Sequence, residues 1–378
     1  MFKGIPAGKI VLLWLTFTLG LLLTVLFMAT GGFIKVAVDF KELFFAVWGY
    51  GWDGAQYLEI VTKGYRFPNQ AFFPLYPLIV WTLHLALPLT VSYRINILLS
   101  LALLFVLYRS LNDLGIEEEA DKVKAIAVYL FFATSFYLQA SYAETVLITL
   151  SALALIKLHK KEYFYSALFA GLATATKPNG VVVSIVLISI YFWNELYIFE
   201  KRKLNVSFKK IVTFLLLILI SNIGILSYFG YLNFYGKGID SFFRAQKEWG
   251  RGEINILQIP SLLKWEYTNF FSHLIEPGKF FFKDTVEVSS LTFLIIMLIV
   301  SFKKLPKEYY LFSLGQILLP LASGTTLSIG RFALVNFPLI LFFSKYLKSN
   351  FSFSIYLYIS TLLQIVLLGF FMSGKFVG

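Results

Sequence analysis

Long apolar runs recur along the 378-residue chain and are separated by short connections rich in Lys and Arg. A helix that crosses a bilayer needs about 20 apolar residues, whereas the strands of a membrane barrel alternate apolar and polar positions over about ten. The runs here are continuous, and hydrophobic residues make up 58% of the chain against 14% charged ones. The mean hydropathy of +0.75 lies outside the range of soluble globular domains. The sequence therefore predicts an all-α polytopic membrane protein.

Composition excludes several kinds of site. The chain has no Cys, so that no disulfide, thiolate nucleophile or thiolate metal site can form. Its three His residues, His84, His159 and His273, show no metal-ligand spacing. The net charge of +12 would suit a nucleic acid, but the Lys and Arg residues cluster between apolar runs, where they set membrane topology. We therefore expect membrane lipids, and no nucleic acid, among the partners.

The distribution of positive charge orients the spans. Lys3 and Lys9 precede the first run, Ile10–Thr30, and place the N-terminus in the cytoplasm. The run 125–138 is short for a crossing, and we expect a half-span or re-entrant helix there, because this choice puts the basic connections 157–162, 200–210 and 303–308 in the cytoplasm. About 11 crossings are then expected, at 10–30, 72–88, 95–111, 143–158, 164–176, 180–199, 211–235, 289–302, 308–323, 331–347 and 351–373.

This topology divides the chain into three parts. We predict an N-terminal transmembrane module at 1–235 with a first outer loop at 31–71, a large outer loop at 236–288, and C-terminal transmembrane helices at 289–378. The two outer loops are expected to form a face above the bundle. No inverted repeat of hydropathy relates the two halves, which is weak evidence against a secondary transporter.

The first outer loop contains the stretch "WDGAQYLEIVTKGY", residues 52–65. Apolar residues at positions 57, 60, 61 and 65 follow the i, i+3, i+4, i+8 spacing of a helix that lies at a membrane interface. Asp53 stands near the beginning of this helix. Two interpretations are open at this point, a catalytic carboxylate and an N-cap, a position at which Asp is among the preferred residues.

Four stretches resemble, in order, the conserved blocks of the phosphatidylinositol-glycan class V family, the second mannosyltransferase of GPI-anchor synthesis. The first is "WDGAQYLEIVTKGY" followed by "AFFPLYPL", and the others are "SYAETVLITLSALAL" (141–155), "GLATATKPNGVV" (171–182) and "RFALVNFPLIL" (331–341). "FFRAQKEWGRG" (242–252) is a fainter match. The resemblance covers about residues 45–341, and this chain has Lys177 where the family usually has Arg.

The resemblance implies a GT-C membrane glycosyltransferase with juxtamembrane helices on its outer face. Such enzymes transfer a sugar, here mannose, from a polyprenyl- or dolichyl-phosphate donor to an acceptor hydroxyl with inversion, using an acidic residue in the first outer loop. On this basis we expect Asp53 to be the catalytic base, because one positioned carboxylate is enough to deprotonate the incoming hydroxyl. Glu144 is a second acid that orients the acceptor, or else only an acid favoured at a helix N-terminus.

The leaving phosphate needs cations aimed at its developing charge. Lys177, Arg331 and Arg244 are the expected ligands, with Lys247 and Arg251 as weaker candidates, although isolated bases at span ends often only snorkel to headgroups. The expected sugar-binding residues are Trp52, Tyr57, Asn179, Gln246 and Trp249.

The expected partners are a polyprenyl-phosphate sugar and a lipid-linked acceptor, and an accessory membrane subunit is left open. No cofactor or metal is indicated, although a divalent metal is not excluded by the resemblance. The active site is expected on the extracytoplasmic or lumenal side. A transporter or flippase of lipid-linked sugars is the alternative; it would place its ionisable groups near the bilayer midplane, whereas Asp53 and Glu144 stand at span ends.

Overall fold

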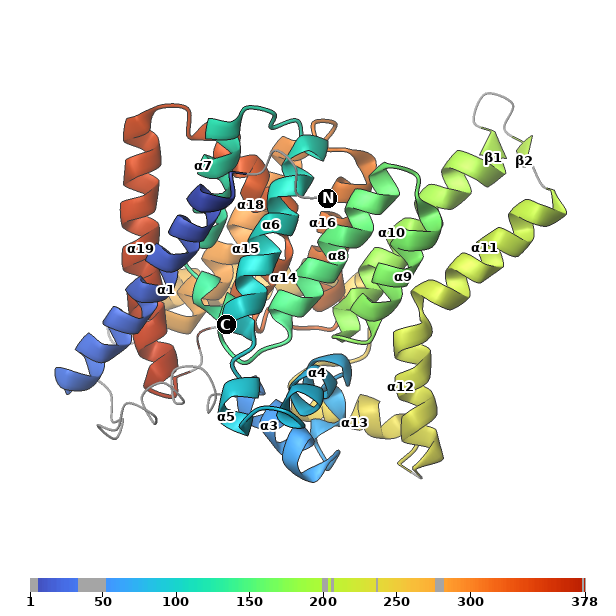
Figure 1. Ribbon diagram of the computed structural model, residues 1–378, viewed down its shortest axis with the longest axis horizontal. Coiled ribbons are helices and arrows are strands. Elements are labelled where there is room, and N and C mark those ends of the chain that lie inside the picture. The colour runs from blue at the N-terminus through green and yellow to red at the C-terminus, as the bar shows by residue number, and fades with distance from the viewer. Residues whose placement is uncertain are drawn as a thin grey trace.

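The computed structural model describes residues 6–32, 52–198, 203–204, 207–235, 237–275, 282–375 and 377. Most of the expected first outer loop before Trp52 lies outside these residues. The described chain is a helical bundle with a smaller group of helices at one end (Figure 1). A two-residue antiparallel ladder pairs Tyr197 with Leu204 and Ile198 with Lys203.

The elements follow one another along the chain in this order. They are α1 (Ala7–Thr30), α3 (Asp53–Lys63), η1 (Asn69–Ala71), α4 (Leu75–His84), α5 (Leu89–Ser92), α6 (Asn96–Asp113), α7 (Glu119–Leu130), η2 (Ser135–Leu138), α8 (Glu144–His159), α9 (Tyr163–Thr174), η3 (Pro178–Gly180), α10 (Val181–Tyr191), η4 (Phe192–Leu196), β1 (Tyr197–Ile198), β2 (Lys203–Leu204), α11 (Phe208–Ser221), α12 (Ile223–Phe234), α13 (Asp240–Glu248), η5 (Ile256–Gln258), α14 (Ile259–Ile275), α15 (Phe282–Ser301), α16 (Lys307–Ala322), α17 (Ile329–Val335), α18 (Phe337–Phe343), η6 (Ser344–Tyr346) and α19 (Asn350–Met372).

Apolar helices of membrane-spanning length confirm an integral, multi-pass membrane protein. Within the described residues, five helical segments are long and apolar enough to cross a bilayer, and up to seven if two bent pairs each count as one span. The bent pairs are α11 with α12, at 57°, and α17 with the helical segment Phe337–Tyr346, at 77°. The expected number of about 11 crossings is not confirmed.

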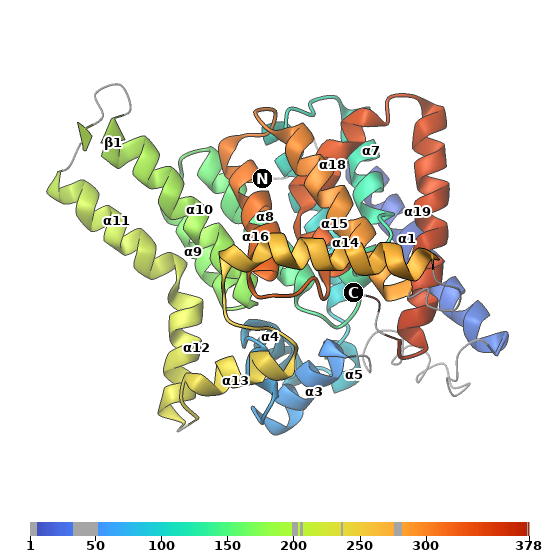
Figure 2. The same ribbon diagram turned by 180° about the vertical axis from the view of Figure 1, so that it is seen from behind.

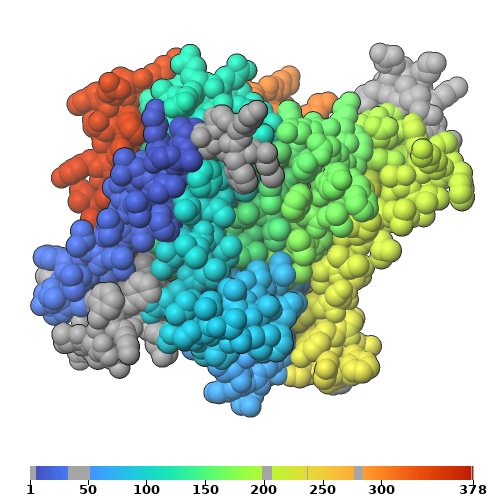
Figure 3. Space-filling view, viewed as in Figure 1, coloured from blue at the N-terminus to red at the C-terminus, as the bar shows by residue number. Residues whose placement is uncertain are grey.

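The bundle has two distinct ends. Helices α3, α4, α5 and α13 form a cap over the lower end in Figure 1, and the side chains of α3 to α5 cover that end in the space-filling view of Figure 3. Helix α14 runs across the face of the bundle that is turned away from the viewer in Figure 1 and towards the viewer in Figure 2. At the other end, Lys9 pairs with Glu119 at 2.7 Å and the Lys345 ammonium donates to the Leu114 carbonyl at 2.8 Å. We call these the cap end and the opposite end.

Residues 72–88 do not make the expected crossing. The Leu75 amide donates to the Ala175 carbonyl at 2.9 Å, and the Tyr93 hydroxyl donates to the Gly54 carbonyl in α3, so that the segment both starts and finishes at the cap end. Between these points α4 is only ten residues long and packs on α3. Its apolar residues form a separate small core with Tyr57, Tyr76 and Tyr93, which explains why a non-spanning segment is so hydrophobic.

A half-span or re-entrant helix is expected at 125–138, but this run does not return to its starting side. It belongs to a segment that begins at the opposite end, where Glu119 pairs with Lys9, and reaches the cap end at Glu144. Helix α7 ends at Leu130, and the chain continues through η2 and irregular backbone. Buried side chains satisfy part of this backbone: Asn96 donates to the Tyr142 carbonyl at 2.7 Å, and Thr145 donates to the Leu138 carbonyl at 2.6 Å. Irregular backbone is tolerated at membrane depth when protein surrounds it in this way.

These two corrections cancel. Residues 72–88 stay at the cap end, whereas 119–143 runs from the opposite end to the cap end. The connection before α7 therefore lies at the opposite end, and from Glu144 onward the two differences from the predicted path offset each other. The large outer loop expected at 236–288 contains α13, η5 and α14 at or near the cap end (Figure 2). The proposed boundaries at 235 and 288 stay a prediction.

Close backbone contact fixes the helices next to the cap. Gly171 in α9 and Gly224 in α12 lie where the two helices touch, and a Cβ atom on Gly224 would stand 2.4 Å from the Gly171 carbonyl oxygen and 2.3 Å from the Ala175 amide nitrogen. Only glycine permits this approach. The contact seats α12 against the end of α9, two residues before Lys177.

Candidate active site

Asp53 is the first residue of α3, and its side chain points into the protein instead of capping the helix. Trp52 occupies the N-cap position with φ +50°, a left-handed conformation that is costly for a bulky residue. No side-chain capping bond is present there. The Asp53 carboxylate accepts a hydrogen bond from Arg331 at 2.6 Å. The N-cap interpretation therefore does not account for this aspartate.

Four charged residues from four distant segments meet at the cap end. We call Asp53, Glu144, Lys177 and Arg331 the charge cluster. Arg331 Nη1 lies 2.6 Å from Asp53 Oδ2 and 3.5 Å from Glu144 Oε1, and Lys177 Nζ lies 2.7 Å from Glu144 Oε1 and 3.9 Å from Asp53 Oδ2. Each cation thus contacts both acids, and the formal charges of the cluster sum to zero.

The charge cluster is buried. The Glu144 side chain has no exposed surface, and those of Arg331, Asp53 and Lys177 are 7%, 12% and 13% exposed. Burial by itself raises the pKa of the Asp53 carboxyl, but the positive charges of Arg331 and Lys177 outweigh it and hold this pKa below its ordinary value. Asp53 is therefore ionised, and both of its close cations are engaged.

Separate elements present each member of the cluster. Glu144 opens α8, directly after the turn that Asn96 holds by its bond to the Tyr142 carbonyl. Lys177 follows α9 in extended backbone before η3. Arg331 lies in the short helix α17, with its guanidinium over the rings of Tyr137 and Tyr142 at 5.6 and 5.3 Å. These aromatic faces add a favourable cation–π contact.

Glu287, in α15, supports Arg331 and was not singled out from the sequence. Its carboxylate accepts the backbone amides of Ser328 and Ile329 at 2.8 Å each, and that of Gly330 at 3.4 Å. Ser328 has φ +71° and its hydroxyl accepts a hydrogen bond from Arg331 Nη2 at 2.7 Å. An acid at the edge of an apolar run was the only signal, and it fits an exposed loop equally well.

The three cations of the outer segment differ in placement. Arg244 is exposed and pairs with Asp240 on the same helix at 3.1 Å. Lys247 is also exposed and lies 3.6 Å from Glu253. Arg251 is partly buried, and its guanidinium lies over the ring of Phe332 at 5.1 Å. Phe332 directly follows Arg331 in the sequence. Of these three, the structure brings Arg251 to the charge cluster.

The expected sugar-binding residues are spread around the cap. Tyr57 is buried against Phe72 and Tyr76, while Trp52 is 39% exposed. Asn179 exchanges two hydrogen bonds with Gln316, each of 3.0 Å. Gln246 donates to the Ala71 carbonyl at 3.3 Å, and Trp249 donates to the Pro68 carbonyl at 3.2 Å. Their sugar-binding roles stay predictions.

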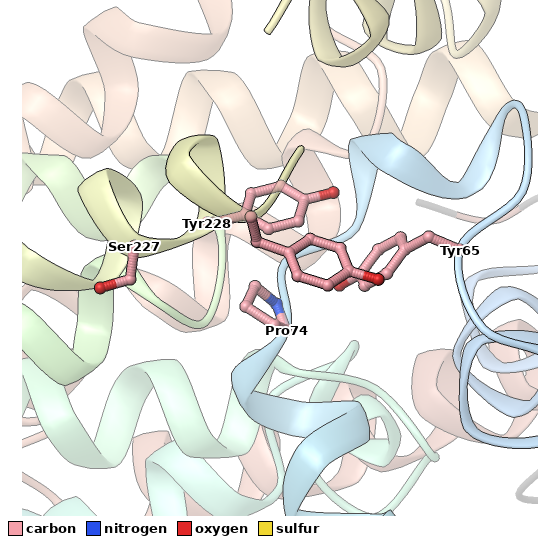
Figure 4. Close-up of a pocket in the computed structure, with 5 residues that line it drawn as sticks. Tyr65, Pro74, Ser227 and Tyr228 are labelled. Carbon is pink, nitrogen blue, oxygen red and sulfur yellow. The ribbon is translucent and has the colours of Figure 1, made fainter. Parts of the chain in front are cut away.

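A small apolar pocket lies beside the cap. It is lined by Tyr65, Pro74, Ser227, Tyr228 and Tyr231, and Figure 4 shows the tyrosine rings gathered over Pro74. The pocket does not contain the charge cluster. Among the described residues, no group of three or more His, Asp or Glu side chains is arranged to hold a metal ion.

Comparisons with known proteins identify the family of the chain. The family model described as Mannosyltransferase (PIG-V) matches residues 21–268, well over half of the chain. GPI alpha-1,6-mannosyltransferase 2 of Mus musculus and its namesake of Cricetulus griseus are each 32% identical over 143 residues, which is 35% of this chain and 29% of the relative. The alignment thus spans less than a third of these relatives. No solved structure matches the chain. The family match includes Asp53, Glu144 and Lys177, and the chain belongs to the PIG-V mannosyltransferase family.

Proposed function

We propose that this protein is an inverting glycosyltransferase that moves mannose from a polyprenyl-phosphate donor to a hydroxyl of a lipid-linked acceptor. The observation that carries the proposal is the charge cluster, in which a buried carboxylate from an extramembrane helix is surrounded by two cations. Base and cations are the two kinds of group that such a transfer needs. The family of the chain supports mannose as the sugar.

Asp53 serves as the general base. The acceptor oxygen attacks the anomeric carbon while its proton passes to the Asp53 carboxylate, and the bond between the anomeric carbon and the phosphate oxygen breaks. The products are a mannosylated acceptor and a polyprenyl phosphate monoester. Because one displacement occurs on the face opposite the leaving group, the anomeric configuration inverts.

Arg331 and Lys177 stabilise the leaving phosphate. Both cations now contact Asp53 and Glu144, and this pairing makes Asp53 a weak base because it lowers the carboxyl pKa. A bound phosphate would compete for the same two cations and add a negative charge nearby. Donor binding therefore loosens the hold on Asp53 and raises its pKa towards the range that a general base needs. Glu144 keeps Lys177 in place through its 2.7 Å contact.

The location of the charge cluster favours an enzyme over a transporter. Asp53 and Glu144 both stand at helix beginnings at the cap end, whereas transport sites are usually found near the middle of the bilayer. The basic connections 157–162 and 303–308 follow α8 and α15 at the opposite end. By the positive-inside rule this end faces the cytoplasm, and the site faces the lumen or the outside.

The relatives suggest the acceptor class. Their name refers to mannose transfer in an α-1,6 linkage to GPI, and we extend to this chain a lipid-linked acceptor with a free sugar hydroxyl. The acceptor would approach Asp53 from the cap, where Trp52 is exposed and Gln246 and Trp249 line the α13 side.

The test is transfer of radiolabelled sugar by the purified protein. Polyprenyl-phosphate mannose and polyprenyl-phosphate glucose are offered in parallel with an extract of membrane lipids, and the anomeric configuration of the product is determined by NMR. We expect a mannolipid of inverted configuration. A product made only from the glucose donor, retention of configuration, or no product across varied acceptor lipids would contradict the proposal.

A further inference from the structure

Arg251 stands apart from the other cations near the site because it has no carboxylate partner. Its Nη1 donates to the Ser323 hydroxyl at 3.3 Å and its Nη2 donates to the Leu327 carbonyl at 3.0 Å. Within the described ranges, no Asp or Glu lies within ion-pair distance of this guanidinium. A cation withdrawn from water without a directly paired carboxylate is costly, and such groups are commonly kept for a ligand.

The position of Arg251 points to the same ligand as Arg331 and Lys177. The Phe332 ring carries the Arg251 guanidinium at 5.1 Å and the Lys177 ammonium at 6.0 Å, and Arg331 is the residue before Phe332. Burial and the nearby Arg331 charge lower the pKa of Arg251 to about 10, while the charges of Asp53 and Glu287 act in the opposite direction, so that Arg251 stays charged at neutral pH.

The way the charges are paired explains what a third cation adds. Each cation of the charge cluster is already paired with both acids. The charge of Glu287 also reaches Arg251, but the Glu287 carboxylate is occupied by the backbone amides of Ser328 and Ile329, and Arg251 forms no ion pair among the described residues. An arriving phosphate can therefore bind to Arg251 before the pairs with Asp53 and Glu144 open.

The backbone around Arg251 is held in place. The Gly252 amide donates to the Ser323 carbonyl at 2.8 Å, and the Asn255 amide and the Gln258 side chain both donate to the Ala322 carbonyl at 2.7 Å. The segment after α13 is thus fastened to the loop that leads to α17. An arginine on a segment that is fixed in this way loses little entropy when it binds an anion.

We propose that Arg251 binds the phosphate of the polyprenyl-phosphate donor as a third cation next to Lys177 and Arg331. This inference rests on the proposed function, and it replaces Arg244, the outer-loop cation that the sequence favoured, as the donor ligand of this segment.

The experiment measures binding of polyprenyl phosphate and of uncharged polyprenol to the full-length protein in lipid nanodiscs. In Arg251→Gln we expect polyprenyl phosphate to bind about ten- to hundredfold more weakly, the usual effect of one charge-assisted hydrogen bond, with polyprenol binding unchanged. Arg251→Lys should recover most of the loss. Lys264→Gln, an exposed cation on α14, is the matched control and should change binding less than twofold.

Ser323→Ala separates charge from anchoring, because it removes one contact of Arg251 and keeps the cation. It should bind polyprenyl phosphate nearly as the wild type does. If Ser323→Ala and Arg251→Lys are as weak as Arg251→Gln, or if polyprenol binding falls equally, Arg251 only fastens the loop and the proposal is wrong. Loss of affinity in Arg244→Gln but not in Arg251→Gln overturns it as well.

Mannose transfer in the same samples distinguishes this proposal from the proposed function. If the wild type transfers mannose and Arg251→Gln has an unchanged KM for the donor, only the role of Arg251 is refuted. If the wild type binds polyprenyl phosphate through Arg251 but transfers no sugar, the enzyme assignment fails and the phosphate site stands.

Discussion

Two groups of polar side chains join helices at the two ends of the bundle, and they are built differently. At the cap end, the charge cluster is buried and each cation contacts both acids. At the opposite end, His159 pairs with Glu308, and Tyr309 donates to Asp113 at 2.7 Å. The His159 side chain there is 38% exposed. We call these four residues the opposite-end cluster.

The two clusters differ in what they do: one only connects helices, and the other also keeps four charged groups buried. The opposite-end cluster joins α6, α8 and α16 with one pair and one neutral donor, and solvent reaches it. The charge cluster joins helices as well, but it buries four formal charges where apolar packing would have been at least as stable. The extra cost at the cap end is what a site for a charged reaction would require.

The substitution Asp53→Asn should give the largest difference between the two ends. It removes the proposed base while keeping the shape of the side chain, so that transfer should fall by about 10²- to 10⁴-fold. Initial rates of mannose transfer by purified protein measure this. The matched change at the opposite end, Glu308→Gln, should leave the rate within about twofold. Equal losses in the two variants would remove the distinction.

Glu144→Gln tests how strongly burial couples the acids and bases. It leaves the Lys177 ammonium without its nearest carboxylate, and breaking a buried pair in this way costs about 3–5 kcal/mol. Thermal unfolding in detergent should show the loss, together with a lower transfer rate. The double variant Glu144→Gln with Lys177→Gln removes one acid and one base, and it should be more stable than Glu144→Gln. A double variant whose losses merely add would show that the pair is not coupled.

All four members of the charge cluster could be predicted from sequence because they lie in short motifs at the ends of apolar runs. Two errors in the predicted path of the chain cancelled, and for this reason Glu144, Lys177 and Arg331 were still assigned to the side of Asp53. Hydropathy reports burial in any apolar setting, and it does not distinguish a cap helix such as α4 from a span.

Contacts between distant segments could not be predicted. The irregular backbone before Glu144 is stable because Asn96 reaches it from α6, and no local pattern encodes that bond. Glu287 likewise acts on amides about 40 positions further along the chain. That Arg251 and not Arg244 lies next to the charge cluster also depends on packing, since both are basic residues of one polar segment.

Glu287→Gln should have an intermediate effect. The amide keeps one acceptor oxygen but loses the charge that binds the three backbone amides before Arg331, which should cost about 1–3 kcal/mol. We expect a lower melting temperature and a transfer rate reduced by up to about tenfold. Glu287→Asp keeps the charge and should recover part of both. A rate that falls while stability is unchanged would point to direct contact with substrate instead.

The pH dependence of transfer should differ between the free enzyme and the donor complex. The Asp53 pKa is lowered in the free protein. The stability that the ionised carboxylate contributes is therefore present above the unfolded pKa of about 4 and is lost as pH falls through the lower folded pKa. The acid limb of kcat/KM reports the same free-enzyme pKa, and it should lie below pH 4. The limb of kcat should lie at higher pH, because the bound phosphate takes up the cations that lower the pKa. If the two acid limbs coincide, donor binding does not change the Asp53 pKa, and the two cations still hold the carboxylate.

The smallest effect is expected from His159→Gln at the opposite end. The pair with Glu308 is partly exposed, and such pairs contribute about 0.2–1 kcal/mol, so that the melting temperature should change only slightly and transfer should stay within about twofold. Thermal unfolding and initial rates on the same preparation measure both. Because α8 begins at Glu144 and ends at His159, this variant also tests whether disturbance at one end of the helix reaches the other. A loss of transfer as large as that of Glu144→Gln would show that the two ends act as one unit, and the charge cluster would then no longer be a locally built site.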